Sequence, residues 1–427
     1  MPVGREIAVV GGGWAGLAAA VEATQRGDRV TLFEMSRQLG GRARDLAADG
    51  LGLDNGQHIC IGAYSETLRL LHVLGVAEAE AFVRTPLRVD FADAPGLELR
   101  AGPPLLAFVG AVLRHPQWRI ADKLALLGAA TRWLAGGFRC DPALTVARLT
   151  ARLPRSIRAE LIDPLCVAAL NTPAEEASAA VFLRVLGDAL FSGRGSADLL
   201  LPRIGLGSVL PAPAGRWLAS AGATLKLGWR VEALTPAGEH WQVDGARYDA
   251  VVLAASAIES ARLTHSFFPA WADTAAALRY EPIVTVYLRS AGSVLPAPML
   301  AMRSNSAAPA QFVFDRGRLG GPTGLLAFVI SGAQPWVDAG AAATLGATRR
   351  QAESALAGLL RAPLETVQVV TEKRATFRCT PQLRRPPMRI AARLCAAGDH
   401  IDGPYPSTLE GAVRSGIAAV RNLFDDC

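Results

Sequence analysis

The chain has 427 residues, of which 51% are hydrophobic and 19% are charged, and its formal net charge is +6. This length favours two or three domains because single cores rarely grow beyond about 250–300 residues, and the apolar content excludes global disorder. Only three of the 44 basic residues are lysines, and no run of arginines forms a basic arm, so we expect no nucleic-acid partner.

Targeting and redox signals indicate a cytoplasmic protein. No apolar stretch of about 18 residues is free of charges, so we expect no membrane-spanning helix, and without an apolar leader we expect no signal peptide. The six cysteines form no Cys-x-x-Cys pair and have no histidine at ligand spacing, which predicts reduced, mostly buried thiols and no metal site. The protein would at most touch the inner face of a membrane.

Residues 6–34 predict a strand, a glycine turn, a helix and a second strand. The turn contains Gly11, Gly13 and Gly16, and the second strand ends at Glu34, 18 residues beyond the last glycine. Such a turn lets a pyrophosphate approach the backbone N–H groups at a helix N-terminus, and the carboxylate would accept hydrogen bonds from a ribose diol. The segment therefore predicts a dinucleotide site.

A loop and a helical region are expected next. Residues 37–63 are glycine-rich and predict an extended loop, after which Ser65 is expected to cap a helix that ends near Gly75. Residues 103–190 are dominated by helical patterns, and one of these helices is expected to begin at Asn171-Thr172-Pro173. A helical insert therefore follows the dinucleotide motif.

The second half of the chain is predicted to be mostly β. Strands are expected at residues 225–234, 248–255, 281–290, 311–315, 324–331, 366–378 and 394–399, before a final amphipathic helix at 408–424. The strand at 248–255 is expected to be fully buried, as in parallel sheets. The strand at 394–399 resembles those of the nucleotide-binding segment at the start of the chain. Such a late return of the chain to the nucleotide-binding domain is typical of a fold that wraps a long, permanently held cofactor.

The amino-terminal motif resembles that of the FAD-dependent amine oxidase and carotenoid desaturase superfamily. The second signature of this superfamily matches Leu39-Gly40-Gly41-Arg42, and the third matches Gly398-Asp399 with Leu409-Glu410-Gly411-Ala412. Within the superfamily, the chain is most similar to the hydroxysqualene dehydroxylase family of squalene-associated, desaturase-like enzymes. Four segments carry this finer similarity, at residues 53–58, 169–173, 197–202 and 404–412.

The resemblance implies an α/β fold with a discontinuous, Rossmann-like FAD-binding domain of the glutathione-reductase type. That domain would comprise residues 1–85, 200–265 and 388–427. A helical insert at 86–199 and a β-rich segment at 266–387 would form the substrate domain. The cofactor would be a tightly held FAD.

The resemblance also implies the residues that hold FAD. The glycine turn would admit the pyrophosphate, Glu34 would hold the ribose, and Arg42 would pair with the diphosphate, a group that guanidinium binds in bidentate fashion. Asp399 would accept hydrogen bonds from ribityl or phosphate-adjacent hydroxyls, or else cap a helix, and Val231 would pair its backbone with adenine from a strand. The expected cofactor-binding residues are Gly11, Gly13, Trp14, Ala15, Gly16, Glu34, Met35, Gly41, Arg42, Asn55, Gly56, Gln57, Val231, Gly398, Asp399, Leu409, Glu410 and Ala412.

The final helix and the loop at 55–58 would flank the flavin ring. The helix N-terminus would stabilise the negative charge of reduced flavin, so we expect the Glu410 side chain to point away and cap the helix. In the loop, Gly56 would permit close approach of the ring, and Gln57 and His58 would face the substrate. His58 is the expected proton donor, with Asp188 and Tyr405 as alternatives.

The implied reaction is reductive dehydroxylation of hydroxysqualene to squalene by hydride transfer. Amine oxidation is disfavoured because no aromatic pair precedes Leu409 and nothing marks Lys373 as catalytic. Two alternatives stay open: desaturation of a carotenoid-like polyisoprene, and a non-catalytic flavoprotein that carries a lipid. The sequence has no second Gly-x-Gly-x-x-Gly motif for NADPH, and no feature of it indicates an oligomeric state.

The apolar helices at 103–137 suit a lipid-like substrate and peripheral contact with a membrane surface. This expectation rests on aromatic residues among basic ones, and the alternative is an ordinary helical cap on the flavin domain. The residues concerned are Trp118, Trp133 and Phe138 with Arg114, Arg119, Lys123 and Arg132.

Overall fold

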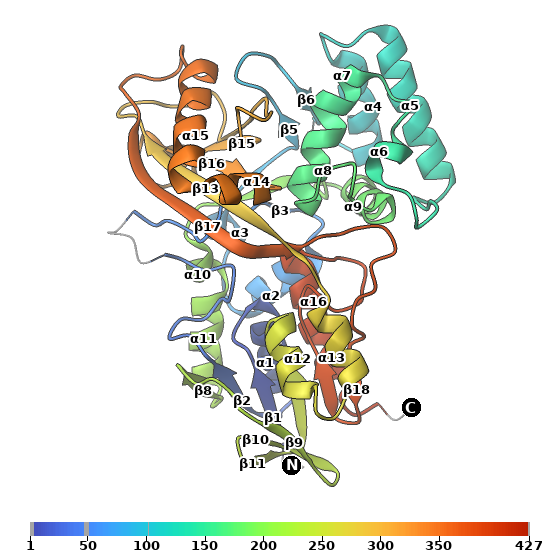
Figure 1. Ribbon diagram of the computed structural model, residues 1–427, viewed down its shortest axis with the longest axis vertical. Coiled ribbons are helices and arrows are strands. Elements are labelled where there is room, and N and C mark those ends of the chain that lie inside the picture. The colour runs from blue at the N-terminus through green and yellow to red at the C-terminus, as the bar shows by residue number, and fades with distance from the viewer. Residues whose placement is uncertain (1–3, 47–50, 101, 426–427) are drawn as a thin grey trace.

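The computed structural model describes residues 4–46, 51–100 and 102–425. Figure 1 shows a lower lobe of sheet and helices, with a β-rich lobe and a helical lobe side by side above it. The lower lobe is built on a six-stranded sheet in the order β18-β19-β12-β1-β2-β8. Its strands are β1 (Glu6–Val10), β2 (Arg29–Glu34), β8 (Thr224–Leu227), β12 (Ala250–Leu253), β18 (Arg389–Ala391) and β19 (Leu394–Ala396).

All neighbours in this sheet are parallel except the edge pair β18 and β19. Its central strands are apolar and almost fully buried, as expected where helices cover both faces. The late return of the chain to the nucleotide sheet is confirmed, because β19 pairs with β12.

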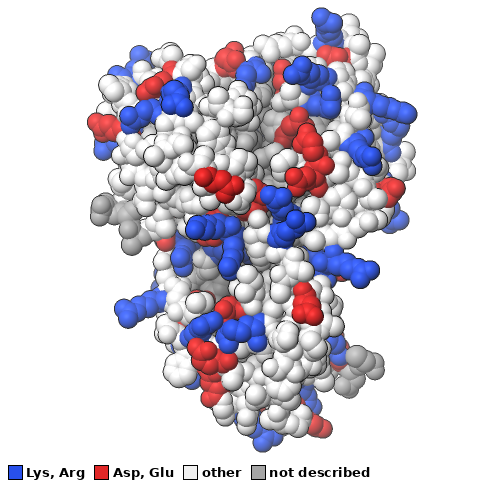
Figure 2. All heavy atoms as spheres, viewed as in Figure 1, with Lys and Arg blue, Asp and Glu red and all other residues white. Residues whose placement is uncertain are grey.

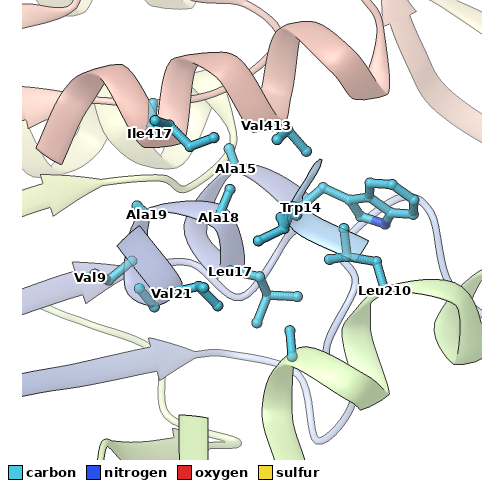
Figure 3. Close-up of a cluster of buried hydrophobic side chains, with 14 of the residues drawn as sticks. Val9, Trp14, Ala15, Leu17, Ala18, Ala19, Val21, Leu210, Val413 and Ile417 are labelled. Atoms are coloured by element: carbon cyan, nitrogen blue, oxygen red, sulfur yellow. The ribbon is translucent and has the colours of Figure 1, made fainter. Parts of the chain in front are cut away.

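Helices α1 (Trp14–Gln25) and α16 (Leu409–Arg421) pack against each other beside this sheet. Figure 3 shows Val413 and Ile417 of α16 directed at the alanine face of α1, near Ala15. The small side chains let the two backbones approach closely. A Cβ on Gly416 would lie 2.1 Å from the carbonyl oxygen of Ala15, so only glycine fits at this crossing.

The β-rich lobe contains an antiparallel five-stranded sheet in the order β14-β15-β16-β13-β17. Helices α14 (Gln334–Ala339) and α15 (Ala341–Ala355) belong to this lobe, and α15 shares a core with one face of β13. The strands are β13 (Tyr280–Arg289), β14 (Met299–Ala301), β15 (Phe312–Asp315), β16 (Leu325–Ile330) and β17 (Glu365–Phe377). The four β-rich segments expected between residues 281 and 378 are therefore confirmed.

The helical lobe is formed by the insert between residues 104 and 191. Its elements are α4 (Pro104–Arg114), α5 (Ile120–Ala135), α6 (Val146–Leu149), α7 (Arg155–Ile157), the π-helix η1 (Arg158–Ile162), α8 (Asp163–Leu170) and α9 (Ala179–Phe191). These helices share one apolar core with residues of α12 and α13.

The remaining elements lie within and between these lobes. The helices are α2 (Ser65–Val73), α3 (Glu78–Ala81), α10 (Leu206–Val209), α11 (Pro211–Ser220), α12 (Ala257–Thr264), α13 (Pro269–Ala276) and the 3-10 helix η2 (Gly317–Leu319). The strands are β3 (Cys60–Ile61), β4 (Phe82–Thr85), β5 (Arg88–Val89), β6 (Leu97–Glu98), β7 (Leu199–Pro202), β9 (Leu234–Ala237), β10 (His240–Val243) and β11 (Ala246–Tyr248).

The predicted burial of the cysteines is confirmed for four of the six. Cys60, Cys140, Cys166, Cys379 and Cys395 are free thiols, and all but Cys140 are buried. Cys427 lies outside the described residues.

Two predicted helix starts are wrong. Asn171 ends α8 in the left-handed conformation, with φ +46°, and its side chain bonds to the β-rich lobe through Glu281 O and Gly332 N. Because that amide is engaged elsewhere, the next helix begins only after Ser178, whose hydroxyl caps it. Ser65 is the first residue of α2 and not its cap, since its hydroxyl accepts a hydrogen bond from Arg414.

The strand predicted at 225–234 is also wrong in extent. β8 ends at Leu227 because Gly228 adopts φ +70° and turns the chain. The N–H groups of Gly228 and Trp229 then donate to Ser36 O and Glu34 O. The following residues run in irregular structure alongside the end of β2.

Asp54 fixes the start of the loop at 55–58. Its backbone carbonyl accepts a hydrogen bond from the Tyr287 hydroxyl of β13 at 3.1 Å, and its Oδ1 accepts one from Leu206 N at 2.8 Å. The residue is 1% exposed, and its Oδ2 has no partner among the described residues. Burial, reinforced by the neighbouring Asp45 carboxylate, raises the pKa of Asp54 to about 7.

The Gly416→Ala substitution should destabilise the protein, because its Cβ would meet the backbone of α1 and not a flexible side chain. We expect a loss of about 1–3 kcal/mol, seen as a lower urea midpoint. Gly128→Ala in α5 is the matched control, since a Cβ there meets no atom within 4 Å and improves helix propensity. Equal midpoints for the two variants would contradict the packing account.

The raised pKa of Asp54 predicts a pH-dependent stability. The folded protein keeps a proton on Asp54 that the unfolded chain releases, so the contribution of Asp54 to stability is full near pH 4 and declines as the pH rises towards 7. Asp54→Asn keeps an oxygen for Leu206 N and removes the titration. Between pH 5 and pH 8, the wild type should lose about 2–3 kcal/mol more unfolding free energy than Asp54→Asn. Urea titrations at both pH values measure this, and equal losses would refute it.

Candidate functional site

A cavity of about 840 Å³ is lined by residues from all three lobes. At one end lie the glycine turn after β1 and the end of β2, and at the other lie apolar residues of α4, α5, α8 and α9. A hollow between the two upper lobes is visible on the face shown in Figure 2. The volume lies within the range of about 300–1,000 Å³ typical of small-molecule sites.

The three glycines of the turn serve three different purposes. Gly11 has φ +113°, and a Cβ there would lie 2.4 Å from Ala254 O, so it makes the tight turn. A Cβ on Gly16 would lie 1.8 Å from Gly11 O, so Gly16 lets the helix approach the turn and does not line the cavity. Gly13 lines the cavity, and a Cβ on it would meet only Gly41 Cα, at 3.9 Å.

The Glu34 carboxylate is held rigidly in the cavity wall. Oε2 accepts a hydrogen bond from Gly12 N at 2.6 Å, and Oε1 accepts one from Ser36 N at 2.7 Å. Each carboxylate oxygen keeps a second lone-pair direction for a further donor. Glu34 is therefore oriented in advance for a ligand diol.

Arg42 binds protein partners at the centre of the cavity. Its guanidinium pairs with the Asp399 carboxylate and donates to Ala375 O of β17 at 2.9 Å. Burial alone would raise the pKa of Asp399, yet the Arg42 charge and the neighbouring His400 ring hold it well below its usual range. The alternative role of Asp399 as a helix cap is wrong, because Thr408 caps α16.

Trp14 ties the Arg42 loop to helix α1. Its indole Nε1 donates to Ala43 O at 3.1 Å, while Gly40 N donates to Gly12 O at 2.9 Å. Both contacts hold the loop against the glycine turn, so the turn and Arg42 share one wall of the cavity.

The loop at 55–58 places amide and imidazole groups beside Arg42. Asn55 Nδ2 donates to Arg42 O and to the Glu372 carboxylate, the latter at 2.7 Å. His58 Nδ1 lies 2.7 Å from Gly56 O, so Nδ1 carries a proton and Nε2 of the neutral ring is an acceptor. Burial, together with the Arg42 charge, lowers the pKa of His58.

Gln57 is directed differently from its neighbours. It is buried, and its Oε1 accepts a hydrogen bond from the buried Arg316 at 3.3 Å. Gln57 lines the cavity, but its side-chain oxygen is engaged by the protein.

Asp188 and Tyr405 line the cavity in a separate, arginine-linked cluster. Arg184 bonds Asp188 Oδ2 at 2.9 Å and lies over the Tyr405 ring, and Arg414 lies over the same ring. Asp188 is thus bound as the partner of an exposed arginine. Of the three expected catalytic residues, only His58 lies with the Arg42 and Asn55 group.

Glu410 does not line the cavity. It is fully buried, and its carboxylate accepts hydrogen bonds from Glu66 N, Thr67 N and the Thr67 hydroxyl. The side chain therefore points away from the site, as expected, but it caps α2 and not its own helix. The prediction that Glu410 binds the cofactor is therefore wrong for its side chain. The unpaired N–H groups at the N-terminus of α2 attract the carboxylate instead.

Val231 lines the cavity from irregular structure and not from a strand, and its carbonyl accepts a hydrogen bond from Arg262 at 2.6 Å. Sequence reasoning missed Tyr280, Glu372 and His400, which also line the cavity. His400 directly follows Gly398-Asp399, so its position in that motif could have indicated it. The remaining predicted residues that line the cavity are Ala15, Met35, Gly41, Leu409, Ala412 and Gly398.

The apolar end of the cavity is walled by one side of α4 and α5, while other side chains of these helices are exposed. Trp133 and Phe138 line the cavity. Trp118 is buried, stacks on His115 and donates to Glu160, so its expected surface role is wrong. Among the described residues, no helix is long and apolar enough to cross a membrane.

The polar end fits a flavin dinucleotide. Among the described residues, no side chain caps the N-terminus of α1, so its first N–H groups are available to a diphosphate. The open surface at Gly13 gives access to them. His400 lines the cavity, is 2% exposed, and its Nε2 has no partner among the described residues.

Comparison with known proteins also indicates a flavin site. Residues 14–424 match the family described as flavin containing amine oxidoreductase. The hydroxysqualene dehydroxylase of Rhodopseudomonas palustris is 30% identical over 451 residues, which cover 97% of each chain. The hydroxysqualene dehydroxylase of Zymomonas mobilis is 28% identical over 96% of this chain and 97% of that one.

A solved structure shares the fold. An oxidoreductase from Methanosarcina mazei has a TM-score of 0.72 over 97% of this chain and 99% of that chain, at 15% identity. The chain therefore belongs to the flavin-containing amine oxidoreductase family, and within it to the hydroxysqualene dehydroxylases, and it is an FAD-dependent oxidoreductase.

Proposed function

We propose that the protein reductively dehydroxylates hydroxysqualene to squalene, a step of squalene and hopanoid biosynthesis. The observation that carries the proposal is one cavity that joins the dinucleotide motif to a long apolar wall. The relatives matched over nearly the whole chain bear this activity in their names. Gly11, Gly13 and Glu34 would hold the adenosine diphosphate half of FAD, and Leu409 and Ala412 would flank the flavin.

The proposed reaction breaks a C–O bond and forms a C–H bond. Bound reduced FAD would supply the hydride, and the hydroxyl leaves with one proton as water. The carbinol carbon is allylic, so departure of the hydroxyl gives a delocalised cation that an apolar wall shields from water. Leu126, Phe182 and Leu186 belong to that wall, and their burial of the hydrocarbon chain positions the reacting carbon.

His58 is our candidate for proton transfer to the leaving hydroxyl. With Nδ1 bonded to Gly56 O, Nε2 is the free position of the ring. Its lowered pKa makes the imidazolium a stronger acid but a rarer species at neutral pH. Asp188 and Tyr405 are weaker candidates, because Arg184 donates a hydrogen bond to the Asp188 carboxylate and lies over the Tyr405 ring.

The reaction is tested with purified, FAD-loaded protein that is reduced with dithionite under anaerobic conditions and mixed with hydroxysqualene. We expect squalene, formed with stoichiometric flavin reoxidation in a single turnover. Protein loaded with oxidised FAD is the control and should form none. Desaturation of phytoene or squalene without squalene formation would support the desaturase alternative instead, and lipid binding without reoxidation would support the carrier.

We further propose that α4 and α5 dock on an anionic membrane surface, from which the apolar end of the cavity takes its substrate. Ile120 and Leu124 are 76% and 62% exposed, and their i,i+4 spacing puts them on one face of α5. Leu106 and Leu113 of α4 are also exposed. Figure 2 shows basic side chains over the region that α4 and α5 occupy in Figure 1. The basic residues of these helices and their flanks are Arg114, Arg119, Lys123 and Arg132.

Vesicle sedimentation tests the docking surface. The wild type should bind phosphatidylglycerol vesicles more tightly than phosphatidylcholine vesicles, and Ile120→Ser/Leu124→Ser should weaken binding roughly tenfold or more. Phe267→Ser/Val294→Ser is the matched control, since it also removes two exposed apolar side chains but lies in other parts of the fold. An equal loss in both double variants, or none in either, would exclude this surface.

A further inference from the structure

We propose that the rings of Trp133 and Phe138, the aromatic stop, close the apolar end of the cavity. The Phe138 ring sets the longest hydrocarbon chain that the site accepts. The proposal rests on the proposed function, because it takes the substrate to be an isoprenoid alcohol, and it adds a residue that determines chain length.

The end of α5 forms a Schellman motif, which brings the two aromatic residues together. Gly137 has φ +61°, and its N–H donates to Leu134 O at 2.9 Å. Phe138 N then donates to Trp133 O at 2.7 Å. In this motif, the two residues joined by the longer-range hydrogen bond commonly make an apolar contact. Here they are Phe138 and Trp133, and both line the cavity.

The backbone of Phe138 is in a left-handed conformation. Its φ is +55°, so a second left-handed residue follows Gly137. This conformation is an outlier for a bulky side chain, and it persists only where the surrounding structure holds it. The contact that accompanies it here is the packing of the Phe138 ring on helix α9.

Helix α9 leaves room for this ring at a glycine. A Cβ on Gly187 would lie 3.2 Å from Phe138 Cγ and 3.4 Å from Phe138 Cδ2, so a larger residue would displace the ring. Glycine lowers the stability of a helix interior, and α9 has one where the ring packs. Leu186 and Leu190 of the same helix line the cavity. The Phe138 ring therefore fills the space between the end of α5 and the cavity-lining helix α9.

The Phe138 ring lies between the cavity and solvent. Phe138 lines the cavity and is half-buried, whereas its neighbours Gly137 and Arg139 are exposed. Leu134 also lines the cavity and is 40% exposed. A hydrocarbon chain that fills the apolar end would meet the ring before it reached water. A chain longer by one isoprene unit would have to displace the ring.

Binding of lengthened substrates tests the aromatic stop. The probes are hydroxysqualene and two analogues, each longer by one isoprene unit at one of its ends. Each is titrated into protein that holds oxidised FAD, and flavin absorbance reports binding. The wild type should bind the analogue whose extra unit reaches Phe138 about tenfold or more weakly than hydroxysqualene, because the extra unit overpacks the site. Phe138→Ala should reduce this difference to about twofold or less, because it leaves a cavity.

Phe268→Ala is the matched control, since Phe268 is also a half-buried phenylalanine but lies outside the cavity. It should keep the wild-type difference. Gly187→Ala crowds the ring from the other side and should weaken binding of hydroxysqualene roughly fivefold. The double variant Gly187→Ala/Phe138→Ala should bind hydroxysqualene as Phe138→Ala does, because the methyl group then has no ring to displace.

The same difference in the wild type and Phe138→Ala, an equal change in Phe268→Ala, or additive losses in the double variant would overturn the assignment. These titrations involve no turnover, so they are separate from the test of the reaction. Binding with the expected pattern but without squalene formation would remove only the proposed reaction. Absence of hydroxysqualene binding to the wild type would remove both proposals.

Discussion

The structure depends on the ion pair between Arg42 and Asp399. Arg42 comes from a loop tied to helix α1, Asp399 follows β19, and the same guanidinium donates to carbonyl oxygens of β17. One cation thus joins the nucleotide sheet to the β-rich lobe across the cavity. Removal of either Arg42 or Asp399 would leave the other without its partner, and a buried unpaired charge costs several kcal/mol. A bound diphosphate would meet an Arg42 guanidinium that is already paired with Asp399 and oriented by it.

This junction separates two kinds of chemistry in one cavity. On the nucleotide side the groups are backbone N–H donors, the fixed Glu34 carboxylate and the Arg42 pair. Beyond the loop at 55–58 most of the side chains that line the cavity are apolar. A long hydrocarbon can therefore be buried next to a highly charged cofactor without either disturbing the other. His58 and Glu372 lie at the boundary, where a polar leaving group would be handled.

The sequence predicted features that arise from local chemistry. The glycine turn, the buried parallel strands and the final helix follow from glycine spacing and apolar periodicity within short segments. Contacts between distant segments were not predictable in the same way. The position of Glu410 predicts a cap on its own helix, but the side chain caps α2, some 340 positions earlier in the chain. The apolar pattern around Val231 predicts a strand, and only the structure shows that Gly228 turns the chain before it. His400 carries no signal beyond its position after Gly398-Asp399.

In the proposed reaction, one cavity brings an isoprenoid alcohol to reduced flavin, and a hydride replaces its hydroxyl. Reduction of the protein in deuterium oxide places exchangeable deuterium on the flavin before the substrate is added. Mass spectrometry of the product then measures the transfer most directly. We expect squalene with a single deuterium at the carbon that carried the hydroxyl. Squalene without deuterium, or a desaturated product, would rule out hydride transfer from the flavin to that carbon.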